Sequence, residues 1–102
     1  MSGVTFWKDD NGQSARLELL AETQTGRRVR VAVRRNAYDF QSSAEATVWT
    51  GNAWQFVASI PYTEMAAVKY NKYWVRCIAT DLQPDASRVL AKALWVLGEE
   101  LK

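Results

Sequence analysis

The sequence predicts an α+β domain in which an antiparallel sheet of four to six strands carries a C-terminal helix packed on one face. The first two-thirds of the chain contains short segments of alternating apolar and polar residues, separated by turn-forming glycine and asparagine. The last segment instead repeats its apolar residues at helical spacing. The length of 102 residues suits one modest core, so we expect a single domain over residues 1–102.

Two hairpins are predicted in the first third of the chain. A short strand at residues 5–8 leads through an Asp-Asp-Asn-Gly turn at 9–12 into a second strand at 15–22, because Asn-Gly is a strong hairpin signal. A loop of residues 24–26, with Gly26 in the left-handed conformation, then leads into an arginine-rich strand. The register that follows pairs three apolar residues with three valines: Leu17, Leu19 and Ala21 with Val33, Val31 and Val29. One face of this hairpin is then wholly apolar, which favours this register over a one-residue slip.

A further hairpin is predicted from residues 43–49 and 54–60, and two registers are open. A three-residue loop of residues 50–52 would turn the even-numbered residues to the covered face: Ala44, Ala46, Val48, Trp54, Phe56, Ala58 and Ile60. It would leave Trp49 on the outer face. A two-residue Gly51-Asn52 turn would instead gather Trp49, Trp54 and Phe56 on one face. We favour the first register because it alternates small residues against large ones.

The remainder of the chain is predicted to end in a helix that covers the sheet. Before it we expect a short helix at residues 63–70 capped by Thr63, and a strand at 72–79. Pro84 suits the first turn of the closing helix, and Gly98 should weaken its last turn. The apolar stripe of that helix consists of Val89, Leu90, Ala93, Leu94, Leu97 and Leu101. Because one helix covers one face, the other face of the sheet should meet water or a partner.

Composition argues against several kinds of chemistry. The chain has no histidine, which removes the commonest general base and metal ligand. The single cysteine, Cys77, lacks partners for a zinc site or an internal disulfide. No phosphate-binding glycine loop is present, and the carboxylates are scattered over turns. We therefore expect no enzymatic activity, no cofactor and no metal site. We also expect most of the five tryptophans to fill the core.

The arginine-rich strand supplies the candidate binding site. Its members are Arg28, Arg30, Arg34 and Trp49 on the uncovered face, with Tyr38 and Phe40 in the adjoining loop. One interpretation is that the arginines are the solvated side of an amphipathic strand. A second is a protein interface, because arginine and tryptophan are enriched at binding hot spots. A third is single-stranded nucleic-acid binding, with guanidinium groups on phosphates and aromatic rings on bases.

The charge balance bears on the choice between the two functional interpretations. A net charge of +2 and the nearby Glu18, Glu22 and Glu45 are poorly suited to nucleic acid. We therefore favour a protein partner, either another protein or a second copy in a homodimer, with nucleic acid as the alternative. The N-terminal sequence lacks the pattern of a signal peptide, and no apolar run reaches membrane-spanning length. A cytoplasmic location without a membrane partner is expected, and the lone cysteine fits a reducing compartment.

Residues 28–61 (RVRVAVRRNAYDFQSSAEATVWTGNAWQFVASIP) resemble a segment of short uncharacterised accessory proteins of tailed phages and prophages. The resemblance lies in the arginine-rich strand, the AYDFQS motif and a hairpin closed by tryptophans. It implies a small protein, encoded by a phage or mobile element, that is made inside a bacterial host cell. Some such proteins bind and disable host defence factors or other host machinery. The resemblance implies no individual site residue.

Overall fold

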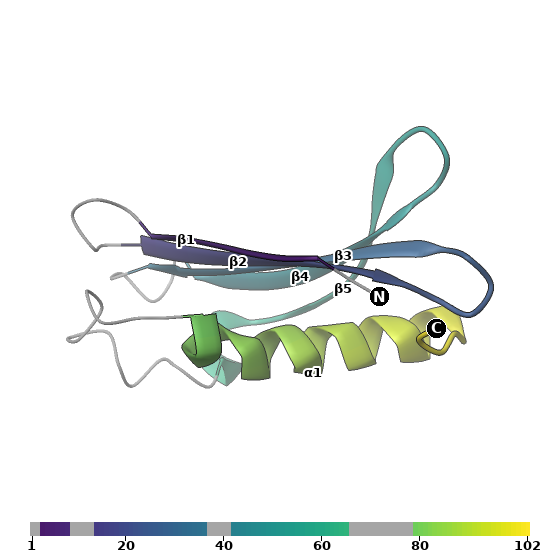
Figure 1. The fold of residues 1–102 in the computed structure, drawn as a ribbon. Helices are drawn as coiled ribbons and strands as arrows, with labels where there is room; N and C mark the ends of the chain where they lie inside the picture. Colours follow the sequence, from purple (N-terminus) through teal and green to yellow (C-terminus); the bar gives the residue numbers. More distant parts are fainter. Residues whose placement is uncertain (1–2, 9–13, 37–41, 66–78) are drawn as a thin grey trace.

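The computed structural model describes residues 3–8, 14–36, 42–65 and 79–102, and shows a five-stranded antiparallel sheet with one helix across one face (Figure 1). The strands are β1 (Val4–Lys8), β2 (Ser14–Glu22), β3 (Arg28–Asn36), β4 (Ser43–Trp49) and β5 (Trp54–Ile60). Each strand pairs with its neighbours in sequence, in the order β1-β2-β3-β4-β5. A short 3-10 helix, η2 (Tyr62–Glu64), and the helix α1 (Ala79–Leu97) follow. The predicted α+β class is therefore confirmed.

The β2–β3 hairpin has the predicted register. Its apolar pairs are Leu17 with Val33, Leu19 with Val31 and Ala21 with Val29. The Thr23 N–H donates to the Arg27 carbonyl at 2.8 Å, which closes the predicted three-residue loop. Gly26 has φ of 90°, the positive value that this loop requires of its last residue. Because all three valines are fully buried, the apolar face of the hairpin forms the floor of the core.

The register of the β4–β5 hairpin differs from the favoured one. The Thr50 N–H donates to the Ala53 carbonyl at 2.9 Å, and Trp49 faces Trp54, so the turn is the two-residue Gly51-Asn52 alternative. A β-bulge then follows, because Thr47 faces Phe56 while the adjacent Ala46 faces Ala58. The extra residue between these two partners is Val57.

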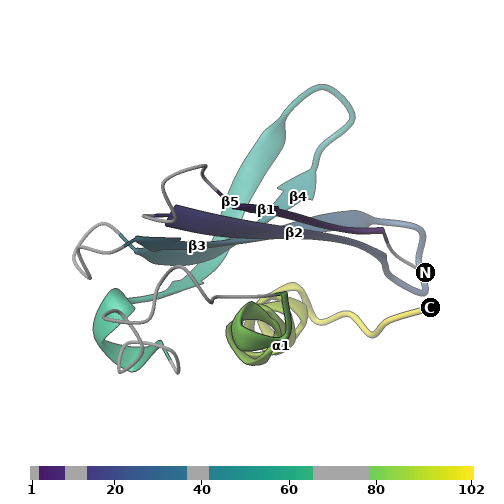
Figure 2. The ribbon, with the colours of Figure 1, turned by 60° about the vertical axis from the view of Figure 1, so that its left-hand side comes forward.

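The bulge changes which side chains of β5 face the helix. Trp54 and Phe56 lie on the outer face, so their predicted place on the covered face is wrong. Beyond the bulge, Ala58 and Ile60 are buried as predicted. A bulge also bends and twists its strand. Figures 1 and 2 show the β4–β5 hairpin rising from the sheet away from α1, on the side of the uncovered face.

The core between sheet and helix is built from small and β-branched residues. Its members on the sheet include Ala15, Leu17, Ala21, Val29, Val31, Val33, Ala44, Ala46, Val48, Ala58 and Ile60, and those on α1 are Leu82, Ala86, Val89, Leu90 and Ala93. Among the described residues no tryptophan belongs to this core, so the expected tryptophan core is wrong. Alanines on both layers let the helix lie close to the sheet and leave little room for an indole ring.

The C-terminal third differs from prediction in three places. Helix α1 begins at Ala79, so Pro84 lies in its second turn and not its first. Of the predicted helix at 63–70, residues 63 and 64 belong to the 3-10 turn η2, whose N-cap is Pro61 and not Thr63, and Met65 is extended. Ala79, the last residue of the predicted strand at 72–79, is helical. The other residues of these two predictions, and the predicted turn at 9–12, lie outside the described residues.

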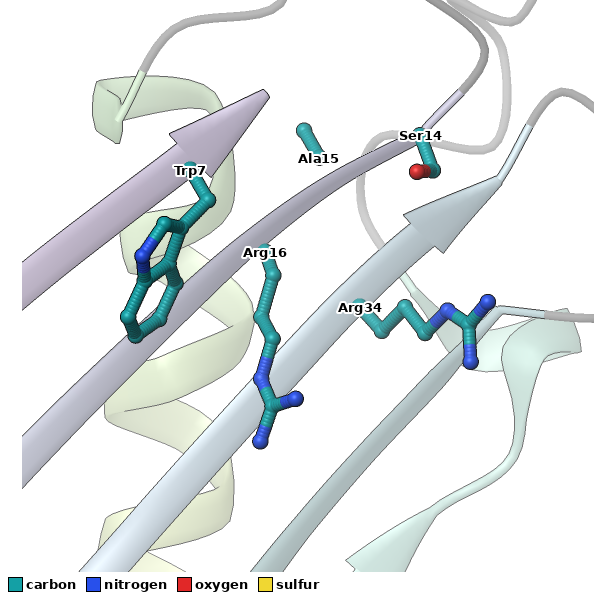
Figure 3. A pocket seen from close by; sticks show the side chains of 5 residues that line it. All are labelled: Trp7, Ser14, Ala15, Arg16 and Arg34. Atoms are coloured by element: carbon teal, nitrogen blue, oxygen red, sulfur yellow. The ribbon is translucent and has the colours of Figure 1, made fainter. Parts of the chain in front are cut away.

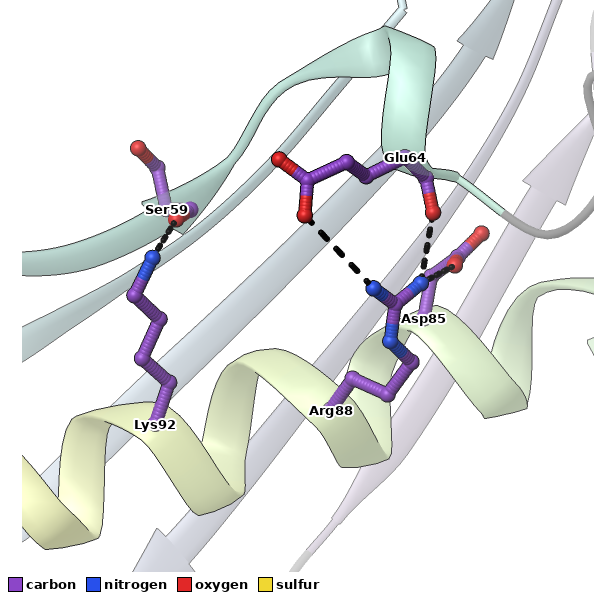
Figure 4. Close-up of polar contacts among 5 residues, drawn as sticks. All are labelled: Ser59, Glu64, Asp85, Arg88 and Lys92. Atoms are coloured by element: carbon purple, nitrogen blue, oxygen red, sulfur yellow. Dashed lines mark hydrogen bonds and ion pairs between the residues drawn. The ribbon is translucent and has the colours of Figure 1, made fainter.

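Polar contacts fasten α1 to the β5 side of the sheet (Figure 4). Arg88 Nη1 donates to the Glu64 carbonyl at 2.6 Å and lies 3.4 Å from the Asp85 carboxylate. Lys92 Nζ donates to the Ser59 carbonyl at 2.9 Å. These contacts and the buried stripe fix which face of the sheet the helix covers. No helix in the described part of the chain is long and apolar enough to cross a membrane.

Gly98 ends α1, which differs from the expected weakening of the last turn. The Gly98 N–H donates to the Trp95 carbonyl at 3.2 Å, and the Glu99 N–H donates to the Leu94 carbonyl at 2.9 Å. Together with a φ of 67° at Gly98, this pair of bonds is a Schellman C-cap. A glycine at this position stabilises the end of the helix, because it adopts the left-handed conformation without a Cβ clash.

Replacing Gly98 with alanine should therefore lower the free energy of unfolding by about 1 kcal/mol, the cost of holding alanine in the left-handed region. No atom lies within 4 Å of an added Cβ, so the loss would come from the backbone and not from crowding. Urea unfolding followed by circular dichroism measures it. Gly3→Ala is the control, since Gly3 has open space and no positive φ. Equal stability of Gly98→Ala and the wild type would contradict the capping role.

Candidate functional site

The face of the sheet opposite α1, here called the outer face, carries the candidate site. In the β2–β3 and β3–β4 registers, Arg28, Arg30 and Arg34 alternate with the buried valines and so project from this face. Trp49 alternates with the buried Val48 and lies on the same face. The structure thus brings these four predicted residues to one face, as expected. Tyr38 and Phe40 lie outside the described residues.

The four residues do not form one continuous basic patch. Arg30 and Arg34 are four residues apart on β3, about 13 Å at the usual rise of a strand. The residue between them on the outer face is Ala32, which lies between Glu18 of β2 and Glu45 of β4. The outer face therefore has two basic ends separated by carboxylates.

At the hairpin end, a group of residues that we call the tryptophan patch surrounds Arg30. Its members are Leu20, Arg30, Trp49, Trp54 and Phe56. The Arg30 guanidinium carbon lies 4.5 Å from the centre of the Trp54 ring. The Trp49 and Trp54 ring centres are 5.3 Å apart and tilted by 58°. This cation–π contact and ring pair hold three large side chains in fixed positions on the surface.

The tryptophan patch also exposes apolar side chains to solvent. Leu20 faces Arg30 across β2 and β3 and is 45% exposed, while Phe56 on β5 is 59% exposed. Beside them a hollow of about 340 Å³ is lined by Gly3, Leu20, Ala21, Glu22, Arg28 and Trp54. Exposed apolar groups next to fixed aromatic rings are a feature of recognition surfaces.

Arg28 lies at the edge of this patch. Its expected cross-strand partner, Glu22, does lie opposite it in the register. The Glu22 carboxylate, however, pairs with Lys102 Nζ at 3.3 Å. Arg28 is exposed and has no ion pair with another described residue. Its charge is therefore available at the border of the hollow.

The other end of the outer face contains a second hollow, of about 320 Å³, that we call the arginine hollow. It is lined by Trp7, Ser14, Ala15, Arg16 and Arg34 (Figure 3). Arg16 and Arg34 face each other directly across β2 and β3, an arrangement that like charges disfavour. Figure 3 shows their side chains pointing away from each other. Arg16 is held by Glu18 at 2.6 Å and lies 5.7 Å from the centre of the Trp7 ring.

Several outer-face residues were not among the predicted site residues: Trp7, Arg16, Leu20, Trp54 and Phe56. Arg16 and Trp7 alternate with Leu17 and Phe6, whose side chains pack into the core, so alternation alone indicates their outward position. For Trp54 the signal was the two-residue Gly51-Asn52 turn, which pairs it with Trp49; alternation along β5 misleads, because the bulge at Val57 reverses it.

Arg35 shows that the arginines of β3 do not all belong to the outer face. It follows Arg34, points to the covered side and is fully buried, with Nη1 4.0 Å from the Met65 sulfur. Its place in the sequence, two residues after the buried Val33, already puts it on the core side. Arg35 therefore belongs to the interior at the end of the sheet and is not available to a ligand on the outer face.

Two further findings bear on the chemistry of the site. Within the described ranges, no group of three or more histidine, cysteine, aspartate or glutamate side chains is placed to hold a metal ion. No protein-family model, no curated protein and no solved structure matches the chain. The inference of function therefore rests on the geometry of the outer face.

Proposed function

We propose that this chain is a non-enzymatic protein-binding domain that acts by covering a surface of its target with the outer face. The tryptophan patch is the observation that carries the proposal. Leu20, which faces the stacked Arg30, is 45% exposed, and Phe56, in the same row with Thr47 between it and Arg30, is 59% exposed. An aromatic and arginine-rich centre of this kind is where most of the binding energy of protein interfaces is concentrated.

The charges of the outer face support a protein target more than a nucleic acid. Glu18 and Glu45 lie between the two basic ends, and Glu45 in particular would repel a phosphate backbone that crossed the face, since Glu18 is paired with Arg16. A protein surface can instead place acidic groups opposite Arg28 and Arg30 and basic groups opposite the carboxylates. The proposed target is therefore a protein with a mixed-charge surface around an apolar centre.

The biological setting of the proposal comes from the sequence resemblance. We propose a phage- or mobile-element-encoded accessory protein in the cytoplasm of a bacterial host, with a host protein such as a defence factor as its target. Inhibition by occupation of a surface needs no catalytic group, and it suits a face without a deep cleft.

Single-stranded nucleic-acid binding is the second candidate, and one observation favours it. Arginine lies against tryptophan at both ends of the outer face, Arg16 at Trp7 and Arg30 at Trp54. Nucleic-acid-binding sheets use aromatic rings to stack bases and cations to hold phosphates. Trp7 is 47% exposed and could present such a ring surface.

The two candidates are separated by a capture experiment with a salt series. Tagged wild type and the triple variant Arg28→Gln/Arg30→Gln/Arg34→Gln are used to capture proteins from bacterial lysate and to bind a labelled oligonucleotide. A protein retained by the wild type and lost from the triple variant supports the first candidate. Oligonucleotide affinity that falls more than about tenfold between 50 and 200 mM salt supports the second. Interactions that all survive the triple substitution would refute both site assignments.

A further inference from the structure

The edge strand β1 has unpaired backbone groups whose positions follow from its register. The Leu20 N–H donates to the Gly3 carbonyl at 2.9 Å, and the same register pairs Thr5 with Glu18. In an antiparallel ladder hydrogen-bonded pairs alternate with pairs that are not bonded. Gly3, Thr5 and Trp7 therefore direct their N–H and C=O groups toward β2. Val4, Phe6 and Lys8 direct theirs outward, away from the sheet.

The opposite edge of the sheet, β5, is protected against pairing with another chain. The bulge at Val57 interrupts its regular backbone, and Lys92 Nζ donates a hydrogen bond to the Ser59 carbonyl. Its hairpin also bends away from the plane of the sheet (Figure 2). Bulges, lysines and twisted ends are the devices by which natural sheets block edge-to-edge association.

Strand β1 has neither a bulge nor a bend in the part of the chain that the structure describes, and its one lysine, Lys8, is its last residue. Its register with β2 runs without a shift. The main contacts of α1 are with β2, β3, β4 and β5, so the helix covers little of β1. Val4 on that side is 50% exposed, and Trp7 on the outer face is 47% exposed. A regular edge with apolar groups on both faces is a template for a further strand.

We propose that β1 pairs with β1 of a second copy, antiparallel, with the two Phe6 residues facing each other at a two-fold axis. The hydrogen-bonding pattern of the strand fits this arrangement. Phe6 is central and directs its backbone groups outward, and Val4 and Lys8 do so at equal distances on either side. Each of the facing pairs, Phe6 with Phe6 and Val4 with Lys8 of the second copy, can then exchange both backbone hydrogen bonds.

The same register also brings the side chains into favourable positions. The two Phe6 rings meet on the covered side, where Phe6 already packs against the core and β1 has few contacts with α1. On the outer face, Trp7 lies opposite Thr5 of the second copy. The pairing therefore joins two five-stranded sheets into one and makes their outer faces continuous across the axis. Such a symmetric, isologous contact closes at two copies and does not propagate.

Sedimentation equilibrium of the purified chain tests the proposal. The expected mass rises with concentration from 11.6 kDa toward twice that value, because a single strand pair makes a small interface. Val4→Pro removes an outward N–H and should keep the protein at the monomer mass, while the bond of β1 to β2 is retained. Val4→Thr keeps that N–H and should dimerise like the wild type. A wild-type mass of 11.6 kDa up to about 500 µM would overturn the proposal.

The register has its own test, which does not depend on stability. In a Cys77→Ser background, Phe6→Cys should form an intermolecular disulfide under mild oxidation, because facing residues have Cα atoms within bridging distance. Val4→Cys should not, since Val4 faces Lys8 and the two Val4 residues lie about 13 Å apart along the strands. Equal cross-linking of the two variants would refute this register. The dimer and the target-binding role are independent, so a monomer that still captures a protein overturns the dimer alone.

Discussion

Leu82→Ala is expected to lower the free energy of unfolding by about 3 kcal/mol, a large fraction of the roughly 5–15 kcal/mol that stabilises a typical domain. Leu82 is fully buried near the start of α1 and belongs to the core between helix and sheet. The sheet side of that core consists mostly of alanine and valine, which are too short to fill the space left by a leucine side chain. Urea unfolding followed by far-ultraviolet circular dichroism gives the difference.

A control on the same helix separates packing from helix propensity. Val96 lies in the last turn of α1 and is 53% exposed, so Val96→Ala should change the free energy of unfolding by no more than about 0.5 kcal/mol. If the two variants lose equal stability, α1 is not packed on the sheet through Leu82. The assignment of the outer face as the uncovered one would then fail as well.

Local sequence signals were sufficient to predict the parts of the fold whose apolar residues repeat with a strict period. In β2 and β3 the alternation of leucines and valines with charged residues admits one register in which no arginine faces a leucine on the covered side. In α1 the predicted stripe is buried at Val89, Leu90 and Ala93 and partly buried at Leu94 and Leu97. Its last predicted member, Leu101, lies beyond the end of the helix and is 43% exposed. Both signals arise because an element that packs on one side must repeat its apolar residues with its own geometric period.

In β5 the prediction from alternation was wrong for Trp54 and Phe56, because the strand contains a bulge. The residues Trp54, Phe56, Ala58 and Ile60 look like one apolar face of a strand. The bulge residue Val57 splits this set, because residues before and after it lie on opposite faces. Alternation alone cannot reveal an extra residue. The turn chemistry of Gly51-Asn52 gave the correct pairing near the loop, and the bulge reconciles that turn with a buried Ala58 and Ile60.

The candidate site shows a similar division. Alternation along β3 places Arg28, Arg30 and Arg34 on the uncovered face, but it does not show which residues lie between them. The separation of two basic ends by Glu18 and Glu45 depends on pairing among three strands. Trp54 belongs to the site because the bulge lets it lie on the outer face while Ala58 and Ile60 are buried. The contact of its ring with Arg30 is a tertiary feature with no counterpart in the local sequence.

Phe56→Ala is expected to reduce binding of a captured target by about tenfold or more, because an exposed aromatic residue beside fixed rings has the features of a hot spot. Phe56 is 59% exposed, so its removal should leave the free energy of unfolding nearly unchanged. Affinity is measured by surface plasmon resonance against the target identified by capture. Trp95→Ala is the matched control, since Trp95 is 84% exposed on α1, away from the outer face, and its loss should not affect affinity.

Arg30→Lys then tests how the tryptophan patch works. Lysine keeps the charge but lacks the planar guanidinium group that stacks on the Trp54 ring. If the patch binds as a fixed aromatic surface, Arg30→Lys should weaken binding several-fold, in the same direction as Phe56→Ala. If binding depends on charge alone, as for a phosphate backbone, Arg30→Lys should bind like the wild type and Arg30→Gln should not. Loss of affinity in Trp95→Ala, with Phe56→Ala unchanged, would move the interface from the sheet to the helix.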